Sequence, residues 1–346
     1  MTAASYTISR TTPVSRVAAI AGLALCLFLA AAPWWAGRAD LRLMSEIFLY
    51  LSLASLWNLL AGYAGLVSVG QQAFVGFGGY MLFAFTMFLG ISPLLAIPIA
   101  GILGAAVALP VAILIFRLRG AYFAIGTWVI AEVFRLVFAQ VSDLGGGSGT
   151  SLPIDVVKSI AANRSAREST SYWLALGIAI LVIAVAFLFL RSRQGLALTA
   201  IRDNELAAKS LGIDIWKTKL VVYIVTAALT SATGALIFLQ KLRISPDAAF
   251  SVNDWTAFVI FIVVIGGIGT LEGPIIGTII FFALRETLAD LGTIYLLVLG
   301  LVAIVVMLRA PKGLWGLFRA KVGIEIFPLA RRVVQPSENQ DGRHGK

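Results

Sequence analysis

Residues Trp255 to Leu288 read WTAFVIFIVVIGGIGTLEGPIIGTIIFFALRETL, an apolar stretch with glycines and a proline in its middle. A helix needs roughly 20 apolar residues to cross a membrane, because the hydrocarbon core is about 30 Å thick and each residue rises about 1.5 Å. This stretch is longer than one crossing requires, and clustered glycine and proline weaken a helix. We therefore predict two short membrane helices joined by a turn. The break is expected at Gly266, Gly267, Gly269, Gly273 and Pro274.

The rest of the chain is rich in further membrane segments. Of its 346 residues, 60% are hydrophobic and 13% are charged, whereas a soluble domain carries about 25% charged residues. The mean hydropathy is +0.94. We therefore predict an all-α polytopic membrane protein with about ten transmembrane helices, some of them short or broken. Besides the stretch above, the candidate crossings are approximately 17–35, 43–61, 66–89, 93–116, 121–140, 172–190, 220–239 and 294–308.

Positive charges predict which helix ends share a side of the membrane, because Lys and Arg concentrate in cytoplasmic loops. Basic residues gather before residue 17, at Arg117 and Arg119, in the loop 191–219 and from Arg309 onward. If all four places are cytoplasmic, both chain ends are cytoplasmic and the number of crossings is even, which gives ten when the first stretch is split. The opposite loops then hold Arg38, Arg42, Lys158, Arg164, Arg167, Lys241 and Arg243.

These patterns divide the chain into a cytoplasmic segment (1–16), one transmembrane domain (17–309) and a cytoplasmic basic tail (310–346). The end of the tail, 331–346, is polar and is expected to be disordered. The first crossing also resembles a secretory signal peptide, in which Ala30 to Ala32 would form the cleavage site. Since Pro33 disfavours cleavage there, we expect this crossing to be retained.

Several classes of function are disfavoured by what the chain contains. Its net charge of +10 would suit nucleic acid, but the basic residues flank apolar segments, so no nucleic-acid partner is expected. The segment 145–150 resembles a phosphate-binding loop without the required lysine. Cys26 and His344 are the single cysteine and histidine, and no acidic cluster lies within the crossings. We therefore expect no catalytic residue, no metal site and no cofactor bound by this chain.

Two glycine runs occupy corresponding places in the two halves of the chain. Residues 62–65 precede one glycine-rich helix, and residues 266–269 precede another. Paired helix breaks predict a transport pathway between two pseudo-symmetric halves, because irregular backbone at membrane depth needs protein or water around it. The alternative is that these small residues only let helices pack closely.

The loop 191–219 contains signals for a short helix. Asp203 or Asn204 can cap its N-terminus, Glu205 suits its first turn, and Gly212 suits the left-handed residue after its last turn. Such a helix on the cytoplasmic side can insert into a cleft of a partner protein. An amphipathic helix lying on lipid headgroups would explain the pattern equally well.

Polar side chains within the crossings mark a candidate pathway. Ser45, Ser52 and Ser55 share one helix face at about 100° per residue, and Asn58 extends it. Glu132 and Arg135 share a face of another crossing, where they either contact the substrate or form a structural ion pair. The candidate pathway residues are Ser52, Ser55, Asn58, Gln71, Gln72, Glu132 and Arg135.

Five glycine-containing motifs in order resemble the LivM-type permeases of branched-chain amino acid ABC transporters, over about residues 54–318. The motifs are Leu66-Val-Ser-Val-Gly-Gln-Gln-Ala-Phe-Val-Gly76, Arg119-Gly-Ala-Tyr-Phe-Ala-Ile125, the loop 195–212, Val264-Ile-Gly-Gly-Ile-Gly-Thr-Leu-Glu-Gly-Pro-Ile-Ile-Gly277 and Ala310-Pro-Lys-Gly-Leu314.

The loop resembles the Glu-Ala-Ala-x-x-x-Gly coupling segment of ABC importers, with one residue inserted after the glutamate. This resemblance implies that the loop contacts an ATPase subunit on the cytoplasmic side. The residues implied in ATPase coupling are Arg202, Asp203, Asn204, Glu205, Ala207, Ala208 and Gly212.

The family resemblance further implies a bacterial inner-membrane importer that works by alternating access. Its partners would be a second, homologous permease, two cytoplasmic ATP-binding subunits that use ATP and Mg²⁺, a periplasmic substrate-binding protein and membrane lipid. The substrate would be a branched-chain or related amino acid, or alternatively urea or an amide.

Other classes of function remain open. An ion-coupled secondary transporter needs an isolated acid in the membrane, whereas Glu132 has Arg135 nearby. A lipid-modifying membrane enzyme needs clustered acids or histidines, and a membrane anchor for another complex would not need broken helices.

Overall fold

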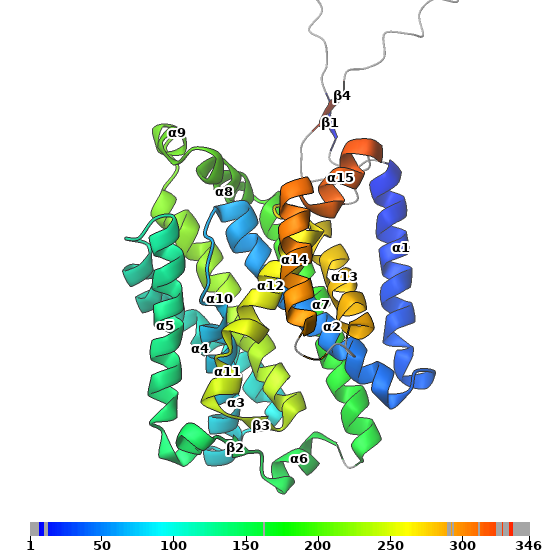
Figure 1. Ribbon diagram of the computed structural model, residues 1–346, viewed down its shortest axis with the longest axis vertical. Coiled ribbons are helices and arrows are strands. Elements are labelled where there is room, and N and C mark those ends of the chain that lie inside the picture. The colour runs from blue at the N-terminus through cyan, green and yellow to red at the C-terminus, as the bar shows by residue number, and fades with distance from the viewer. Residues whose placement is uncertain are drawn as a thin grey trace, which may run out of the picture.

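The computed structural model describes residues 7–9, 13–161, 163–288, 292, 294–310, 312–322, 327 and 332–334. Helices dominate this part of the chain, and most of the long ones run between the two ends of the molecule (Figure 1). The all-α polytopic prediction is confirmed.

Short connections separate most neighbouring elements. The helices are α1 (Pro13–Ala30), α2 (Arg38–Asn58), α3 (Gln71–Phe88), α4 (Pro93–Ile115), α5 (Ala121–Ala139), α6 (Ile154–Ile160), α7 (Arg164–Arg191), α8 (Arg193–Asp203), α9 (Glu205–Ser210), α10 (Ile215–Lys241), α11 (Pro246–Ala249), α12 (Phe258–Gly266), α13 (Glu272–Thr287), α14 (Ile294–Arg309) and α15 (Gly313–Val322). The strands are β1 (Thr7–Ser9), β2 (Thr150–Ser151), β3 (Arg243–Ile244) and β4 (Arg332–Val334). One π-helical turn, Leu59–Tyr63, extends α2, and another, Asn253–Ala257, leads into α12. The remaining short turns are 3₁₀ helices at Ala32–Trp34, Ser142–Leu144 and Gly146–Ser148.

Eight helical segments within the described residues are long and apolar enough to cross a membrane. The chain is therefore a multi-pass membrane protein. The two other predicted crossings correspond to α3, with 18 residues, and α13, with 16 residues. Helix α3 is less apolar because it begins with two glutamines and contains several glycines, and it packs inside the bundle, where protein surrounds it.

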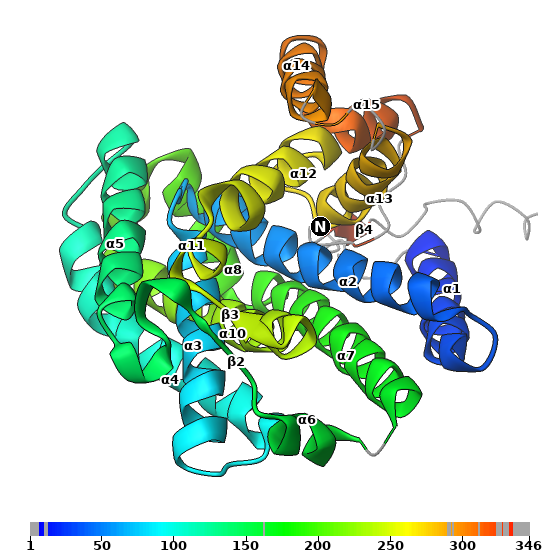
Figure 2. The same ribbon diagram turned by 60° about the horizontal axis from the view of Figure 1, so that its bottom comes forward.

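The centre of the bundle is formed by α2, α3 and α10. Helix α2 runs between α7 and α12 (Figure 2), and α10 packs along α3 and α4. The backbones of α3 and α10 approach closely: a Cβ atom on Gly78 would lie 1.9 Å from the carbonyl oxygen of Ser231, and one on Gly234 would lie 2.2 Å from that of Val75. Small residues thus allow close helix packing here, as they do in membrane proteins generally.

The predicted break in the stretch 255–288 is present. Helix α12 ends at Gly266 and α13 begins at Glu272, so the turn comprises 267–271. Gly273 and Pro274 lie in the first turn of α13 rather than in the break, because proline is tolerated at the start of a helix, where its missing N–H has no helical acceptor.

Two other boundaries differ from the prediction. Helix α7 begins at Arg164 rather than near residue 172, because its first two turns are polar and no hydropathy window detects them. Residues 66–70, predicted to start a crossing, are not helical. Gly65 has a φ of 69°, and the Leu66 N–H donates to the Leu60 carbonyl, so the π-helical turn ends there and the helix restarts at Gln71.

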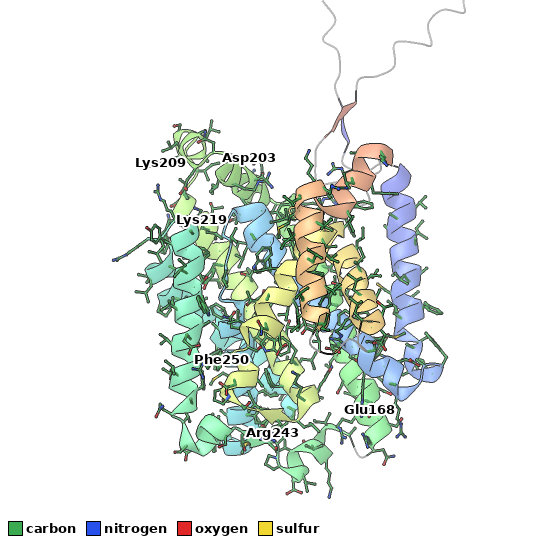
Figure 3. All side chains as sticks on the ribbon, in the orientation of Figure 1. Glu168, Asp203, Lys209, Lys219, Arg243 and Phe250 are labelled. Atoms are coloured by element: carbon green, nitrogen blue, oxygen red, sulfur yellow. The ribbon has the colours of Figure 1, made fainter. Side chains whose placement is uncertain are left out.

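The molecule has two distinct ends, which we call the α9 face and the β3 face. Asp203, Lys209 and Lys219 mark the α9 face, and Arg243 marks the opposite β3 face (Figure 3). Strand β1 pairs with β4, so segments near both chain ends lie together, beyond α15 on the α9 side (Figure 1). The prediction of disorder falls on 331–346, and it is wrong for 332–334, which form β4 because they pair with β1. Residues 331 and 335–346 lie outside the described residues, as do 1–6 and 10–12.

Candidate functional site

The loop 191–219 folds into two helices that project from the α9 face (Figure 1). Asn204 ends α8 and caps α9: its Oδ1 accepts a hydrogen bond from the Ala207 N–H at 3.0 Å. Glu205 lies in the first turn of α9 and pairs with Lys219 at 3.2 Å. After α9, Gly212 adopts a φ of 81°, a conformation that residues with a Cβ rarely adopt.

Helix α9 exposes apolar side chains away from the bundle. Leu206 is 80% exposed and Leu211 is 79% exposed, whereas Ala208 is buried against the base of the loop. Asp214 then caps α10 and is held by Lys217, whose backbone N–H and ammonium both bond its carboxylate, so that the pKa of Asp214 lies below its ordinary value. The loop is thus anchored at both ends while its tip presents leucines outward.

Arg202, the penultimate residue of α8, links this loop to the bundle. Its Nη1 donates to the Gly62 carbonyl oxygen at 2.8 Å, and its Nε and Nη2 donate to Asp203 at 3.0 and 2.9 Å. The same guanidinium lies beside the second glycine run, because a Cβ atom on Gly269 would be 3.5 Å from Nη1. A single side chain therefore connects the projecting helices to both helix breaks.

The two glycine runs identified in the sequence lie against each other. A Cβ atom on Gly62 would lie 2.6 Å from the Gly269 nitrogen and 2.9 Å from its Cα. Asn58 joins them: its Nδ2 donates to the Thr270 carbonyl at 2.7 Å, and its Oδ1 accepts from the Gly269 N–H at 2.8 Å. A π-helical turn at this point fits the frequent occurrence of such turns at functional sites.

We call the group Asn58, Gly62, Arg202, Gly269 and Thr270 the junction. Helix α15 packs against the turn that contains Gly269 and Thr270. Gly313, at the start of α15, has a φ of 71°, and a Cβ atom there would lie 2.3 Å from the Gly267 Cα. Within the break itself, a Cβ atom on Gly266 would lie 1.8 Å from the Gly273 carbonyl oxygen. The turn between α12 and α13 is therefore packed on several sides by backbone.

Of the candidate pathway residues on α2 and α3, Gln71 and Gln72 connect elements, whereas Ser52 bonds its own helix. Ser52 donates to the Phe48 carbonyl at 2.8 Å, Gln71 donates to the Leu53 carbonyl at 2.9 Å, and Gln72 accepts from the Thr256 hydroxyl. Ser55 is buried on the same helix. The Gln71 Oε1 has no partner within the described residues, and Gln71 lines a water-sized cavity of about 20 Å³.

Glu132 and Arg135 form an ion pair on α5, with 2.9 Å between Nε and Oε1. Arg135 also reaches Asp247 in α11 at 2.9 Å. This group ties α5 to α11, and both members of the pair remain partly exposed. The structure therefore does not place Glu132 as an isolated acid.

A larger cavity, which sequence reasoning missed, lies toward the β3 face. Its volume is about 630 Å³, and its walls come from α2, α7, α10, α12, α13 and the turn before α12. Its charged residues are far apart in the sequence, so no motif contains them. Two signals were available: the charge pattern placed Arg42, Arg164, Arg167 and Lys241 on one side of the membrane, and Arg285 is the one basic residue of the stretch 255–288. The charged residues of the wall are Arg42, Glu46, Arg164, Arg167, Glu168, Lys241, Asp254 and Arg285.

Comparison with known proteins places this architecture in a family. The family described as "Branched-chain amino acid transport system / permease component" matches residues 41–308. The LivM permease protein of the high-affinity branched-chain amino acid transport system of Escherichia coli (strain K12) is 26% identical over 325 residues, covering 88% of this chain and 76% of that protein.

Two archaeal proteins of Methanocaldococcus jannaschii are also similar. Its probable branched-chain amino acid transport permease LivM is 29% identical over 196 residues, or 56% of each chain. Its probable LivH permease is 26% identical over 150 residues, covering 40% of this chain and 46% of that protein. No solved structure matches significantly. Since the family match covers most of the chain, this protein belongs to the family of branched-chain amino acid transport system permease components.

Proposed function

We propose that this chain is the permease subunit of an ATP-driven importer and forms a translocation path for branched-chain or related amino acids. It is a transport subunit, and ATP with Mg²⁺ is used by two partner ATPase subunits. A second, homologous permease completes the membrane part, and a binding protein delivers substrate. The similarity to both LivM and LivH proteins supports pairing between related permeases.

The observation that carries this proposal is the junction. Helix α9 projects from the bundle with exposed leucines, as expected of a helix that inserts into a partner. Arg202 then connects the loop to both helix breaks. A displacement of α9 by an ATPase would therefore be transmitted to the ends of α2, α12 and α13, which is what alternating access requires.

In this proposal the α9 face is cytoplasmic, the β3 face is periplasmic and the protein resides in the bacterial inner membrane. The junction closes the cytoplasmic side with direct backbone contacts between Gly62 and Gly269. The 630 Å³ cavity lies on the opposite side, toward the source of substrate. The arrangement corresponds to a state that accepts substrate from outside.

The test is uptake by proteoliposomes that contain this chain with the partner subunits encoded beside it and the binding protein. Radiolabelled leucine, other amino acids and urea are compared with and without ATP inside the vesicles. Glu205→Arg is expected to abolish uptake, because it replaces the partner of Lys219 with a like charge at a helix N-terminus.

Asp155→Arg, an equally drastic charge change in α6 on the β3 side, is the matched control and should retain uptake. Uptake that follows a proton or sodium gradient and ignores ATP would reject the importer proposal in favour of a secondary transporter.

A further inference from the structure

The cavity near the β3 face has the size and lining of a ligand site. Ligand pockets commonly span about 300–1,000 Å³ with a mostly apolar wall and a few polar groups, and this cavity measures about 630 Å³. It lies among helices from both halves of the chain, toward the end from which substrate is proposed to arrive. No residue of the junction or of the loop 191–219 lines this cavity, so the contacts described above do not explain why its wall is charged.

Most charges in the wall neutralise one another. Arg285 holds Glu46 through two hydrogen bonds of 2.7 Å. Glu168 accepts from Arg42 at 2.5 Å and lies 3.4 Å from Arg164. These contacts fix the shape of the wall, because each of these five charged groups is held by a partner from the same or a neighbouring helix.

Three charges in the wall form no ion pair within 4 Å among the described residues: Arg167, Lys241 and Asp254. The Lys241 ammonium is nevertheless close enough to the Asp254 and Glu46 carboxylates to interact with both charges. Lys241 ends α10 with its Nζ 4.6 Å from the centroid of the Trp255 ring and 5.7 Å from that of Phe238. Asp254 lies beside Trp255 in the π-helical turn before α12. A charge within a membrane protein is costly without a partner. An ammonium and a carboxylate are thus available in one cavity.

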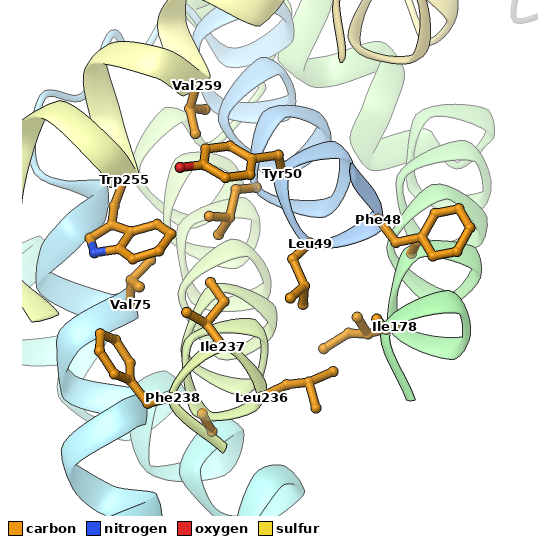
Figure 4. Packing of buried hydrophobic residues seen from close by; sticks show 14 of the residues in the cluster. Phe48, Leu49, Tyr50, Val75, Ile178, Leu236, Ile237, Phe238, Trp255 and Val259 are labelled. Atoms are coloured by element: carbon orange, nitrogen blue, oxygen red, sulfur yellow. The ribbon is translucent and has the colours of Figure 1, made fainter. Parts of the chain in front are cut away.

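Most of the rest of the wall is aliphatic and aromatic, and Ser45, Ser171 and Gln240 add uncharged polar groups. Leu49 and Tyr50 of α2 lie near Ile237 of α10 and Trp255 (Figure 4), and Phe258 continues this surface on α12. The wall therefore combines an apolar surface with two cations and one carboxylate that form no close ion pair.

We infer that this cavity is a binding station inside the permease for a zwitterionic amino acid with an apolar side chain. The Lys241 ammonium takes the substrate carboxylate, the Asp254 carboxylate takes its ammonium, and Leu49, Ile237 and Phe258 contact its side chain. Arg167 adds positive potential near the carboxylate. The inference rests on the proposed import function and deepens it.

This assignment also chooses between the substrate classes. Urea and simple amides carry no charge, so they would leave Lys241 and Asp254 unpaired, and a site built for charged groups rejects a ligand that lacks them. A monocarboxylate would satisfy only Lys241, and an amine would satisfy only Asp254. An α-amino acid satisfies both.

The test measures ATP-dependent leucine uptake by the full complex in proteoliposomes, with isocaproate and isopentylamine as competitors. Each competitor carries one of the two charges of leucine on a similar apolar chain. Lys241→Gln and Asp254→Asn should each raise the KM for leucine at least tenfold, with Lys241→Arg and Asp254→Glu restoring part of the loss. In Asp254→Asn, isocaproate should compete with leucine more effectively than in the wild type, because the variant lacks the carboxylate that binds the ammonium of leucine.

Arg243→Gln, two residues beyond Lys241 but outside the wall of the cavity, and Asp155→Asn are the matched controls and should change the KM less than twofold. If the wild-type complex takes up leucine with ATP and the Lys241 and Asp254 variants keep its KM and its competitor preference, the binding station is rejected while the import function stands. If the wild-type complex shows no ATP-driven uptake of any amino acid, both proposals fall.

The same variants distinguish an amino acid in the cavity from an anionic lipid headgroup. In that case the loss caused by Lys241→Gln should disappear in vesicles of pure phosphatidylcholine, and Asp254→Asn should not weaken transport in any lipid. That pattern would overturn the inference. A loss that persists for both variants in phosphatidylcholine supports it.

Discussion

Arg202 connects the projecting helices α8 and α9 to the buried turn that follows α2. Its guanidinium forms three hydrogen bonds, two to Asp203 and one to the Gly62 carbonyl. The planar fork of arginine supports this geometry, which a lysine ammonium does not reproduce. The link crosses 140 positions of sequence and joins α8 to the π-helical turn that extends α2.

We therefore predict that Arg202→Ala uncouples the transporter. ATP hydrolysis by the assembled complex should continue, whereas leucine uptake per ATP hydrolysed should fall about tenfold or more, and Arg202→Lys should recover only part of it. Parallel assays of phosphate release and uptake in the same vesicles measure this ratio. Arg193→Ala, at the exposed start of α8, should leave the ratio unchanged. Equal loss of hydrolysis and uptake in Arg202→Ala would indicate a failure of assembly instead.

Gly62 matters because the backbone of Gly269 packs directly against its Cα, where a side chain would not fit. Gly62→Ala should destabilise the folded protein, because the new Cβ would lie 2.6 Å from the Gly269 nitrogen. Overpacking of this kind typically costs about 1–3 kcal/mol. Thermal unfolding in detergent measures the effect. Gly177→Ala, in a helix with open space around its Cα, should be neutral or should stabilise by about 0.5–1 kcal/mol. Identical melting of the two variants would contradict the close contact.

At the level of elements, the sequence predicted features that depend on local chemistry. The break between α12 and α13 follows from its glycines, and the cap and left-handed end of α9 follow from Asn204 and Gly212. The first two turns of α7 and the loss of helix at 66–70 depend on tertiary partners, so hydropathy did not reveal them. The cavity was not predicted for the same reason, because its charges come from four separate helices and one connecting turn.

Pathway residues show the limit of local patterns most clearly. The polar stripe on α2 was identified from its helical spacing, but spacing alone does not say what the side chains meet. In the fold, Ser52 bonds the backbone of its own helix, whereas Asn58 joins a segment more than 200 residues away. Whether any of these side chains contacts substrate remains a prediction.

Helix α9 yields a prediction about partner binding. Leu206 is 80% exposed, and burying a leucine contributes about 1.5–3 kcal/mol. Leu206→Asp should therefore weaken association of the ATPase subunits by at least tenfold without lowering the melting temperature of the isolated permease. Co-purification of ATPase subunits and thermal unfolding measure the two quantities. Leu188→Ser, at a position 65% exposed on α7, is the control and should not release the ATPase. Full retention of the ATPase by Leu206→Asp would exclude α9 as its docking element.

For the molecule as a whole, the two faces differ in chemistry as well as in shape. The α9 face carries the projecting helices, the junction and the paired β1 and β4 segments. Charged helix ends around a large cavity occupy the other side. A helix that docks to an ATPase and a cavity that receives substrate belong on opposite sides of the membrane, so this asymmetry and the distribution of basic residues support the same orientation.

Cysteine labelling in intact cells tests that orientation. After Cys26 is replaced by serine, Lys209→Cys in α9 and Lys158→Cys in α6 place one exposed thiol at each end of the bundle. A membrane-impermeant maleimide should label Lys158→Cys in intact cells, and it should label Lys209→Cys only after the inner membrane is permeabilised. Both variants should support wild-type leucine uptake, which shows that the labelled protein is the folded one.

The reverse labelling pattern would place α9 in the periplasm, where it has no access to ATP-driven subunits. The junction could not then transmit ATP hydrolysis, and the cavity would face the cytoplasm. Because continuous helices join the two faces, one labelling result fixes the side of the membrane on which each face lies. If α9 is cytoplasmic, the cavity with Lys241 and Asp254 lies on the side from which an importer receives its substrate.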